Sequence, residues 1–107
     1  MAINQVEPKE VFRINQQTGQ VVLVDVREAD EYQEVSSPLA ELAPLSTFDA
    51  KGFAKNHSKQ TAVYVICRSG RRSMKAGELL MKEGFSEVYN VIGGMIAWEE
   101  AGLPVVR

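Results

Sequence analysis

The chain has 107 residues, a length that suits one domain spanning residues 1–107 and is too short for two. Hydrophobic residues make up 45% and charged residues 24%, and the net charge of −2 argues against a nucleic-acid or membrane-surface role, since both favour a basic face. The single cysteine excludes an internal disulfide and a cysteine-rich zinc site. Because the N-terminus lacks a signal-peptide pattern and no apolar run is long enough for a membrane helix, we expect a cytoplasmic protein.

Strand-like and helix-like patterns alternate along the first half of the chain. A helix is predicted over 8–17, because proline suits its first turn and Gly19 suits its exit. The run VVLVDV over 21–26 predicts a buried strand, and a short helix is expected over 29–34. Residues 35–45 are rich in turn formers and predict irregular structure. A further helix is expected to begin after Ser46 or Thr47, either of which suits a cap.

The second half repeats this alternation. A buried strand over 62–66 is followed by a helix over 71–83, a strand over 88–91 and a last short helix that ends at Gly102. Strands that alternate with helices predict an α/β fold, with a central, mostly parallel sheet and helices on both faces. Ligands bind such sheets at the carboxyl ends of the strands, which directs attention to the segment after residue 66.

The segment CRSGRRS, over 67–73, joins a buried strand to a helix. Such a loop can turn its backbone N–H groups inward as an anion-binding nest, and the helix N-terminus adds further donors. This setting favours a thiolate, so Cys67 is predicted to be the nucleophile. The residues predicted to hold an anionic substrate or the sulfur it delivers are Arg68, Ser69, Gly70, Arg71, Arg72 and Ser73.

Two further features bear on this site. Asp25 ends a strand on the ligand side, where it either lines the site or pairs with Arg27, and both interpretations stay open. Arg27 and Glu31 are expected to form a structural pair. Cations at a helix N-terminus oppose the helix dipole, which favours a bound anion, and we expect Arg72 to matter more than Arg71 for it.

Three stretches resemble the rhodanese-homology domain. They are DVRE with EY over 25–32, the loop over 67–72, and GGMIAW with AGLPV over 93–105. The resemblance implies a three-layer fold, sulfur transfer through a persulfide on Cys67, and neither a cofactor nor a metal. Over 35–40 the chain has VSSPLA where the family usually has GHIPGA, so one wall of the site is expected to differ.

The resulting hypothesis is a thiosulfate sulfurtransferase. Its partners would be a small anionic sulfur donor and a thiophilic acceptor such as cyanide or a thiol, and a protein acceptor is left open. Neither nucleic acid nor a membrane is expected as a partner. One alternative is a non-catalytic rhodanese-like binding or sulfur-carrier module. Another is a cysteine-dependent phosphatase, whose signature places arginine sixth after the cysteine, whereas Arg72 is fifth and Ser73 sixth.

Overall fold

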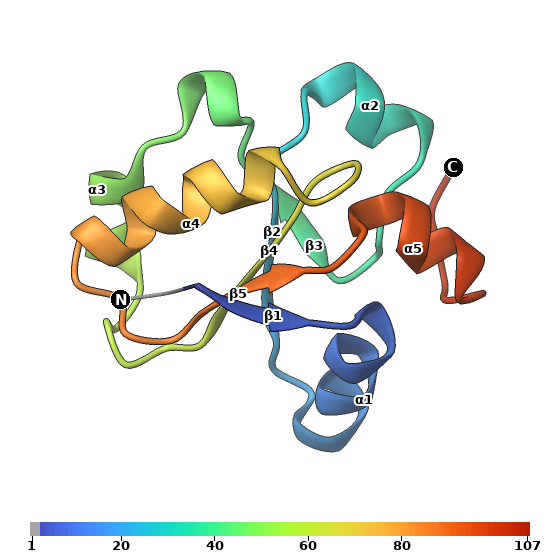
Figure 1. Ribbon diagram of the computed structural model, residues 1–107, viewed down its shortest axis with the longest axis horizontal. Helices are drawn as coiled ribbons and strands as arrows, with labels where there is room; N and C mark the ends of the chain where they lie inside the picture. Colours follow the sequence, from blue (N-terminus) through green and yellow to red (C-terminus); the bar gives the residue numbers. More distant parts are fainter. Residues whose placement is uncertain (1–2) are drawn as a thin grey trace.

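Five parallel strands form one sheet in the computed structural model, which describes residues 3–107 (Figure 1). In spatial order the strands are β1 (Asn4–Val6), β5 (Val88–Val91), β4 (Val63–Ile66), β2 (Val22–Asp25) and β3 (Ala40–Leu42). Every pairing between them is parallel. The carboxyl ends of the strands therefore meet at one edge of the sheet, which confirms the predicted α/β fold.

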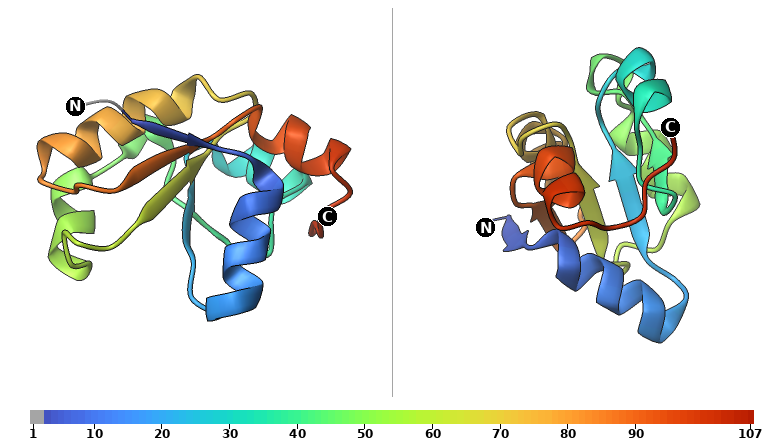
Figure 2. Two further views of the ribbon diagram at one scale, coloured as in Figure 1. Left: turned by 60° about the horizontal axis from the view of Figure 1, so that its bottom comes forward. Right: turned by 90° about the vertical axis from the view of Figure 1, so that its right-hand side faces the viewer.

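Helices cover both faces of this sheet (Figure 2). The helical elements are α1 (Pro8–Thr18), α2 (Ala29–Glu34), the 3₁₀ turn η1 (Leu45–Thr47), α3 (Ala50–Asn56), α4 (Arg72–Lys82) and α5 (Gly94–Glu100). Side chains of α3 and α4 pack on the face that carries Val24 and Val65. Side chains of α1 and α5 pack on the opposite face, which carries Leu23. Successive strand residues point to opposite faces, so an apolar run with a helix layer on each side buries all of them.

Most element boundaries lie within a residue or two of the prediction, and three elements differ. The two edge strands, β1 and β3, were not predicted. The helix expected after Ser46 or Thr47 begins instead at Ala50, because η1 occupies Leu45–Thr47. Its cap is Asp49, whose Oδ1 accepts a hydrogen bond from the Gly52 N–H at 3.0 Å.

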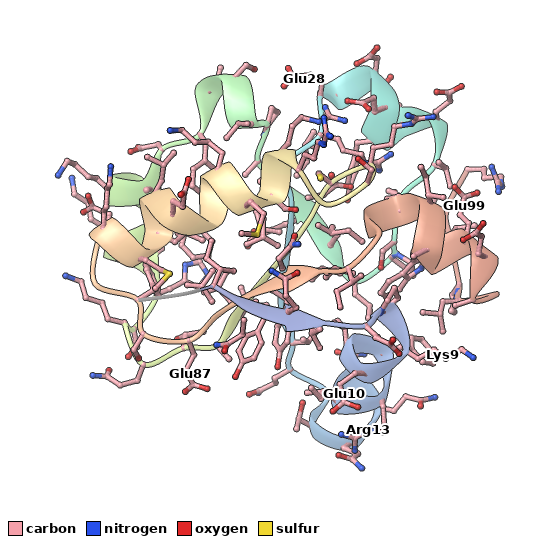
Figure 3. The ribbon with its side chains drawn as sticks, viewed as in Figure 1. Lys9, Glu10, Arg13, Glu28, Glu87 and Glu99 are labelled. Carbon is pink, nitrogen blue, oxygen red and sulfur yellow. The ribbon has the colours of Figure 1, made fainter. Side chains whose placement is uncertain are left out.

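Most large apolar side chains lie inside, and most charged side chains lie outside, with the buried Asp25 and Arg27 as exceptions. Trp98 and Phe85 are fully buried, one on each face of the sheet. Figure 3 shows Glu10 and Arg13 next to each other on the outer surface of α1, where they form an ion pair. Among residues 3–107, no helix is both long and apolar enough to cross a membrane.

Candidate active site

The loop between β4 and α4 lies at the carboxyl edge of the sheet, where the start of α5 supports it. The Met95 N–H donates to the Cys67 carbonyl at 2.8 Å, and the Ile96 N–H donates to the Arg68 carbonyl at 3.2 Å. Gly94 makes this close approach possible, since a Cβ there would lie 2.3 Å from the Cys67 carbonyl oxygen. Gly94, the first residue of α5, therefore lets α5 support the loop from a distant part of the sequence.

The Cys67 thiol is buried and lies inside the curl of this loop. The side chain is 1% exposed, and its Sγ accepts a hydrogen bond from the Gly70 N–H at 3.0 Å. Gly70 has a φ of 104°, a left-handed conformation that favours glycine and turns the N–H inward. The Ser73 Oγ lies 3.3 Å from Sγ on the other side. The Gly70 N–H thus faces the sulfur as predicted, and anion binding by the loop stays a prediction.

Burial destabilises the Cys67 thiolate, and these hydrogen-bond donors stabilise it. Burial by itself raises the pKa of the Cys67 thiol, but hydrogen bonds outweigh it, so the pKa lies below its usual value. The largest of these hydrogen bonds involves the Ser73 side chain. Backbone N–H groups of Ser73, Gly70 and Ser69 supply the rest. The hydrogen-bond donors of the loop therefore stabilise an anionic sulfur, and the charge of Arg72 also interacts with it.

The three arginines of the loop lie in two different environments. Arg68 and Arg71 are exposed, and within residues 3–107 neither side chain makes an ion pair. Arg72 forms two hydrogen bonds to Glu31 on α2, from Nη1 to Oε1 at 2.7 Å and from Nη2 to Oε2 at 2.8 Å. This contact holds the pKa of Glu31 at about 2. Arg72 is therefore occupied by an internal carboxylate.

Asp25 lies at the end of β2, where it binds Arg27. Both of its carboxylate oxygens accept hydrogen bonds from the Arg27 guanidinium, at 2.8 to 3.1 Å, and the pair is buried. The predicted ion pair between Arg27 and Glu31 is wrong. The Glu31 carboxylate binds Arg72 instead, and Arg27 donates only to the Glu31 backbone carbonyl, at 3.3 Å. A role of Asp25 toward substrate stays a prediction.

The atypical segment over 35–40 forms one wall beside the loop. The Val35 carbonyl accepts a hydrogen bond from Arg27 Nη2 at 2.6 Å, and Ser36 forms an antiparallel bridge with Val106 near the C-terminus. Val35 then lines a groove of about 190 Å³ together with Arg68 and Ile96. The divergent segment is thus held in place beside a groove that Arg68 of the loop also lines.

Comparison with known proteins agrees with this arrangement. A family model described as the rhodanese-like domain matches residues 8–101. The chain belongs to the rhodanese-like domain family. A sulfurtransferase of Allochromatium vinosum is 33% identical over 97% of this chain and 95% of that protein. YrkF of Bacillus subtilis, named as a proposed sulfur carrier, is 37% identical over 71% of this chain and 40% of that protein. The crystal structure of a rhodanese-like domain protein from Staphylococcus aureus superposes with a TM-score of 0.81 at 30% identity, over 98% of this chain and all of that one.

Two side chains that no sequence motif singled out also reach this rhodanese-like site. Asn90, near the carboxyl end of β5, is 5% exposed and accepts a hydrogen bond from the Ser73 hydroxyl. Gln5 on β1 accepts a hydrogen bond from the Asn90 amide at 2.9 Å. One signal for Asn90 was present, because a lone amide within an apolar strand requires a buried partner.

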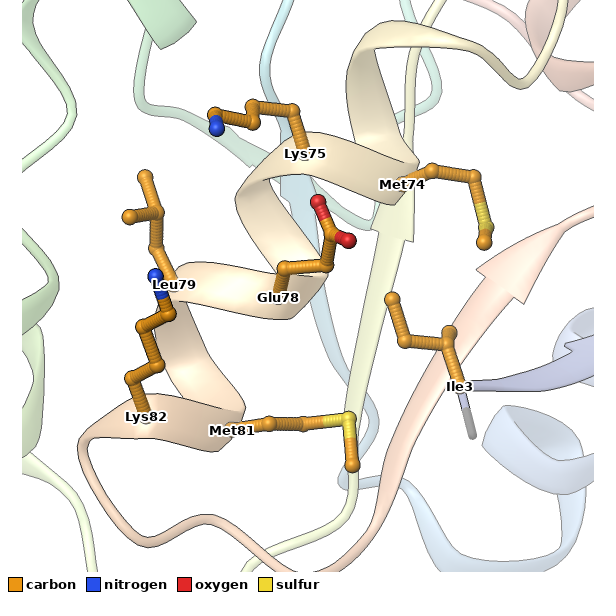
Figure 4. A pocket seen from close by; sticks show the side chains of 7 residues that line it. All are labelled: Ile3, Met74, Lys75, Glu78, Leu79, Met81 and Lys82. Carbon is orange, nitrogen blue, oxygen red and sulfur yellow. The ribbon is translucent and has the colours of Figure 1, made fainter. Parts of the chain in front are cut away.

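A larger cavity lies away from the thiol. It measures about 620 Å³ and lies over the exposed side of α4, between Lys75 and Lys82 on the helix and Ile3 before β1 (Figure 4). Cys67 does not line it. Cys67 does not line the smaller groove either, but Arg68 of the rhodanese-like loop does.

Proposed function

We propose that this chain is a sulfurtransferase that moves a sulfane sulfur from thiosulfate, or a similar anionic donor, to a thiophilic acceptor through a persulfide on Cys67. The observation that carries the proposal is the buried Cys67 Sγ, which accepts the Gly70 N–H at 3.0 Å within a loop that lowers its pKa. A thiolate prepared in this way attacks sulfur without a separate general base.

The proposed reaction has two half-reactions. The Cys67 thiolate attacks the outer sulfur of thiosulfate, a new S–S bond forms, and sulfite leaves with the electron pair of the old bond. Cyanide or a thiolate then attacks the outer sulfur of the persulfide. The bond to Sγ breaks and returns its electron pair to the Cys67 thiolate, and the product is thiocyanate or an acceptor persulfide.

The loop residues divide between the two ends of the donor. Backbone N–H groups of Ser69, Gly70 and Ser73 face the sulfur, where negative charge persists in the persulfide. The exposed guanidinium groups of Arg68 and Arg71 are the groups available to the departing sulfite. Arg72 is not assigned to the donor, because Glu31 already binds it.

A sulfur-carrier role in the same chemistry is the second candidate. The exposed side chain of Ile96, at 41%, belongs to a residue whose N–H donates to the Arg68 carbonyl of the loop, and Ile92, exposed at 46%, precedes the glycine pair that leads to it. Such a rim suits a protein that receives the sulfur from Cys67. The resemblance to YrkF supports the same candidate. We propose a cytoplasmic location for either role, since a lone cysteine suits a reducing compartment.

Turnover with matched substrates separates these functions. Thiosulfate with cyanide, thiosulfate with a small thiol, and an aryl phosphate are each offered to the wild type and to Cys67→Ser. The proposal expects Cys67-dependent thiocyanate over many turnovers and negligible phosphate release. A single stoichiometric sulfur transfer without turnover would favour the carrier. Cys67-dependent phosphate release that exceeds sulfur transfer would contradict both.

A further inference from the structure

A chain of polar contacts runs from the Cys67 sulfur to the protein surface. Sγ lies 3.3 Å from the Ser73 Oγ, Ser73 Oγ donates to Asn90 Oδ1, and Asn90 Nδ2 donates to Gln5 Oε1 at 2.9 Å. Cys67, Ser73 and Asn90 are buried, whereas Gln5 is exposed. Asn90 and Gln5 are register partners on β5 and β1, so their side chains lie on the same face of the sheet.

The Ser73 hydroxyl has one hydrogen and two neighbours that need it. While Cys67 is a thiol, S–H donates to Ser73 Oγ and the hydroxyl donates to Asn90, so every group is satisfied. A thiolate or a persulfide has no proton on Sγ, and the sulfur is stabilised further when the hydroxyl turns to it. That turn leaves Ser73 Oγ and Asn90 Oδ1 facing each other as two acceptors, which is unfavourable inside a protein.

We propose that Asn90 is a positioning residue whose side-chain amide, by reversing, directs the Ser73 O–H either toward itself or toward the Cys67 sulfur. In the reversed state Asn90 Nδ2 donates to Ser73 Oγ, and the hydroxyl donates to the sulfur. An amide suits this role because it offers a donor and an acceptor from the same position. A carboxylate at residue 90 would accept only, and an aliphatic side chain would do neither.

Gln5 is the group that makes the reversal inexpensive. When Asn90 turns its Oδ1 outward, Gln5 reverses as well, and its Nε2 becomes the donor to that oxygen. In the present orientation Gln5 Nε2 points at the Met74 thioether at 3.4 Å, a weak acceptor whose loss costs little. Gln5 is exposed, so water can replace the hydrogen bonds that its side chain gives up on reversal. The two amides therefore form a pair with two orientations of similar free energy.

The test changes the outer end of this chain, where substitution does not disturb the core. In Gln5→Glu the new side chain only accepts, so Asn90 keeps Nδ2 outward and the Ser73 hydroxyl stays away from the sulfur. In Gln5→Lys it only donates, which favours the reversed state. The readout is the pKa of Cys67, from the pH profile of its alkylation by iodoacetamide. We expect Gln5→Glu to slow alkylation near neutral pH by about threefold to tenfold, and Gln5→Lys to speed it.

Controls separate this effect from a long-range effect of the new charge. Asn4→Asp and Asn4→Lys place the same charges on the neighbouring exposed residue of β1 and should change the rate by less than about twofold. The Gln5 variants are also made in a Ser73→Ala background and in an Asn90→Leu background. Either background breaks the chain of contacts, so the opposite shifts should vanish there. The charged groups around the thiol, namely Arg68, Arg71 and the Arg72–Glu31 pair, are the same in every variant.

Each result decides the matter. Opposite shifts in the wild type that disappear in either background support the proposal. Shifts that persist without Ser73 or Asn90, or that equal those of the Asn4 variants, show a charge effect and overturn it, as does the absence of any shift. The inference rests on Cys67 as the sulfur-carrying nucleophile, but alkylation needs no sulfur transfer. A Cys67 that alkylates but never gains sulfur would contradict the proposed function alone.

Discussion

The Arg72 guanidinium and the Glu31 carboxylate form a two-point ion pair, at 2.7 and 2.8 Å, although the residues are 41 positions apart in the chain. Glu31 Oε1 also accepts the Glu28 N–H at 3.0 Å, which caps the start of α2. One carboxylate thus joins α2 to the first turn of α4, directly after the loop that holds Cys67. The pair stabilises the wall of the site and removes part of the positive charge that the sequence places at this helix end.

This pair should be measurable as stability. Arg72→Ala and Glu31→Gln should each lower the free energy of unfolding by about 1 to 2 kcal/mol, because the pair is two-pronged and only partly exposed. The double variant should lose less than the sum of the two. Arg13→Ala is the matched control, since it breaks the more exposed Glu10–Arg13 pair on α1 and should leave stability almost unchanged. Additive losses in urea unfolding would show that the two side chains act independently.

The same pair predicts a dependence of stability on pH. The folded protein holds the pKa of Glu31 at about 2, below its ordinary value of 4.5, with the hydrogen bonds from Arg72 as the main cause. A lowered pKa contributes stability above the unfolded value and loses that contribution as pH falls toward the folded value. The stability difference between the wild type and Glu31→Gln should therefore be full near neutral pH and shrink between about pH 5 and pH 2. A difference that stays constant over this range would contradict the assignment.

Arg71 should behave in the opposite way to Arg72. Arg71 is exposed, precedes α4 at the N-cap position and has no ion pair among the described residues, so Arg71→Ala should leave stability within about 0.5 kcal/mol of the wild type. It should lower kcat/KM for thiosulfate by about tenfold at low salt, and the loss should shrink at high salt. This order reverses the sequence expectation, which favoured Arg72. An unchanged kcat/KM at low salt would remove Arg71 from the donor site.

Gly94 should tolerate no side chain, for a reason that lies in the loop. A Cβ at Gly94 would lie 2.3 Å from the Cys67 carbonyl oxygen and 2.6 Å from the Arg68 backbone, at a φ of 55°. Gly94→Ala should therefore cost about 3 kcal/mol or more and impair sulfur transfer. Gly102→Ala is the control, because its φ of 72° carries similar backbone strain but nothing lies within 4 Å of its Cβ. It should cost about 1 kcal/mol and leave activity intact, and equal effects of the two variants would refute the packing argument.

The fold was predictable where sequence signals are local. Apolar β-branched runs defined β2, β4 and β5, and glycines marked helix ends, as Gly19 shows with a left-handed φ of 68°. Both missed strands lie at the edges of the sheet and have only three residues. Edge strands bury less surface, so they carry little of the apolar pattern that identifies an inner strand.

In the candidate site too, only the features set by neighbouring residues in the sequence were predictable. The nest around Cys67 was predictable, because Gly70, Ser73 and the start of α4 lie within a few positions of it. The partner of Arg72 was not, since Glu31 comes from a different helix and binds only once the sheet has brought α2 beside α4. Asn90 lies 17 positions from Ser73, and Gln5 lies 85 positions from Asn90. The parallel pairing of β1 with β5 brings Gln5 and Asn90 together.

The intact mass of the protein after incubation with thiosulfate tests the central claim most directly. If Cys67 carries sulfur as a persulfide, the wild type gains one sulfur atom, about 32 Da, cyanide removes it, and Cys67→Ser gains nothing. A wild type that stays at its original mass, or a Cys67→Ser variant that gains the same mass, would contradict the account.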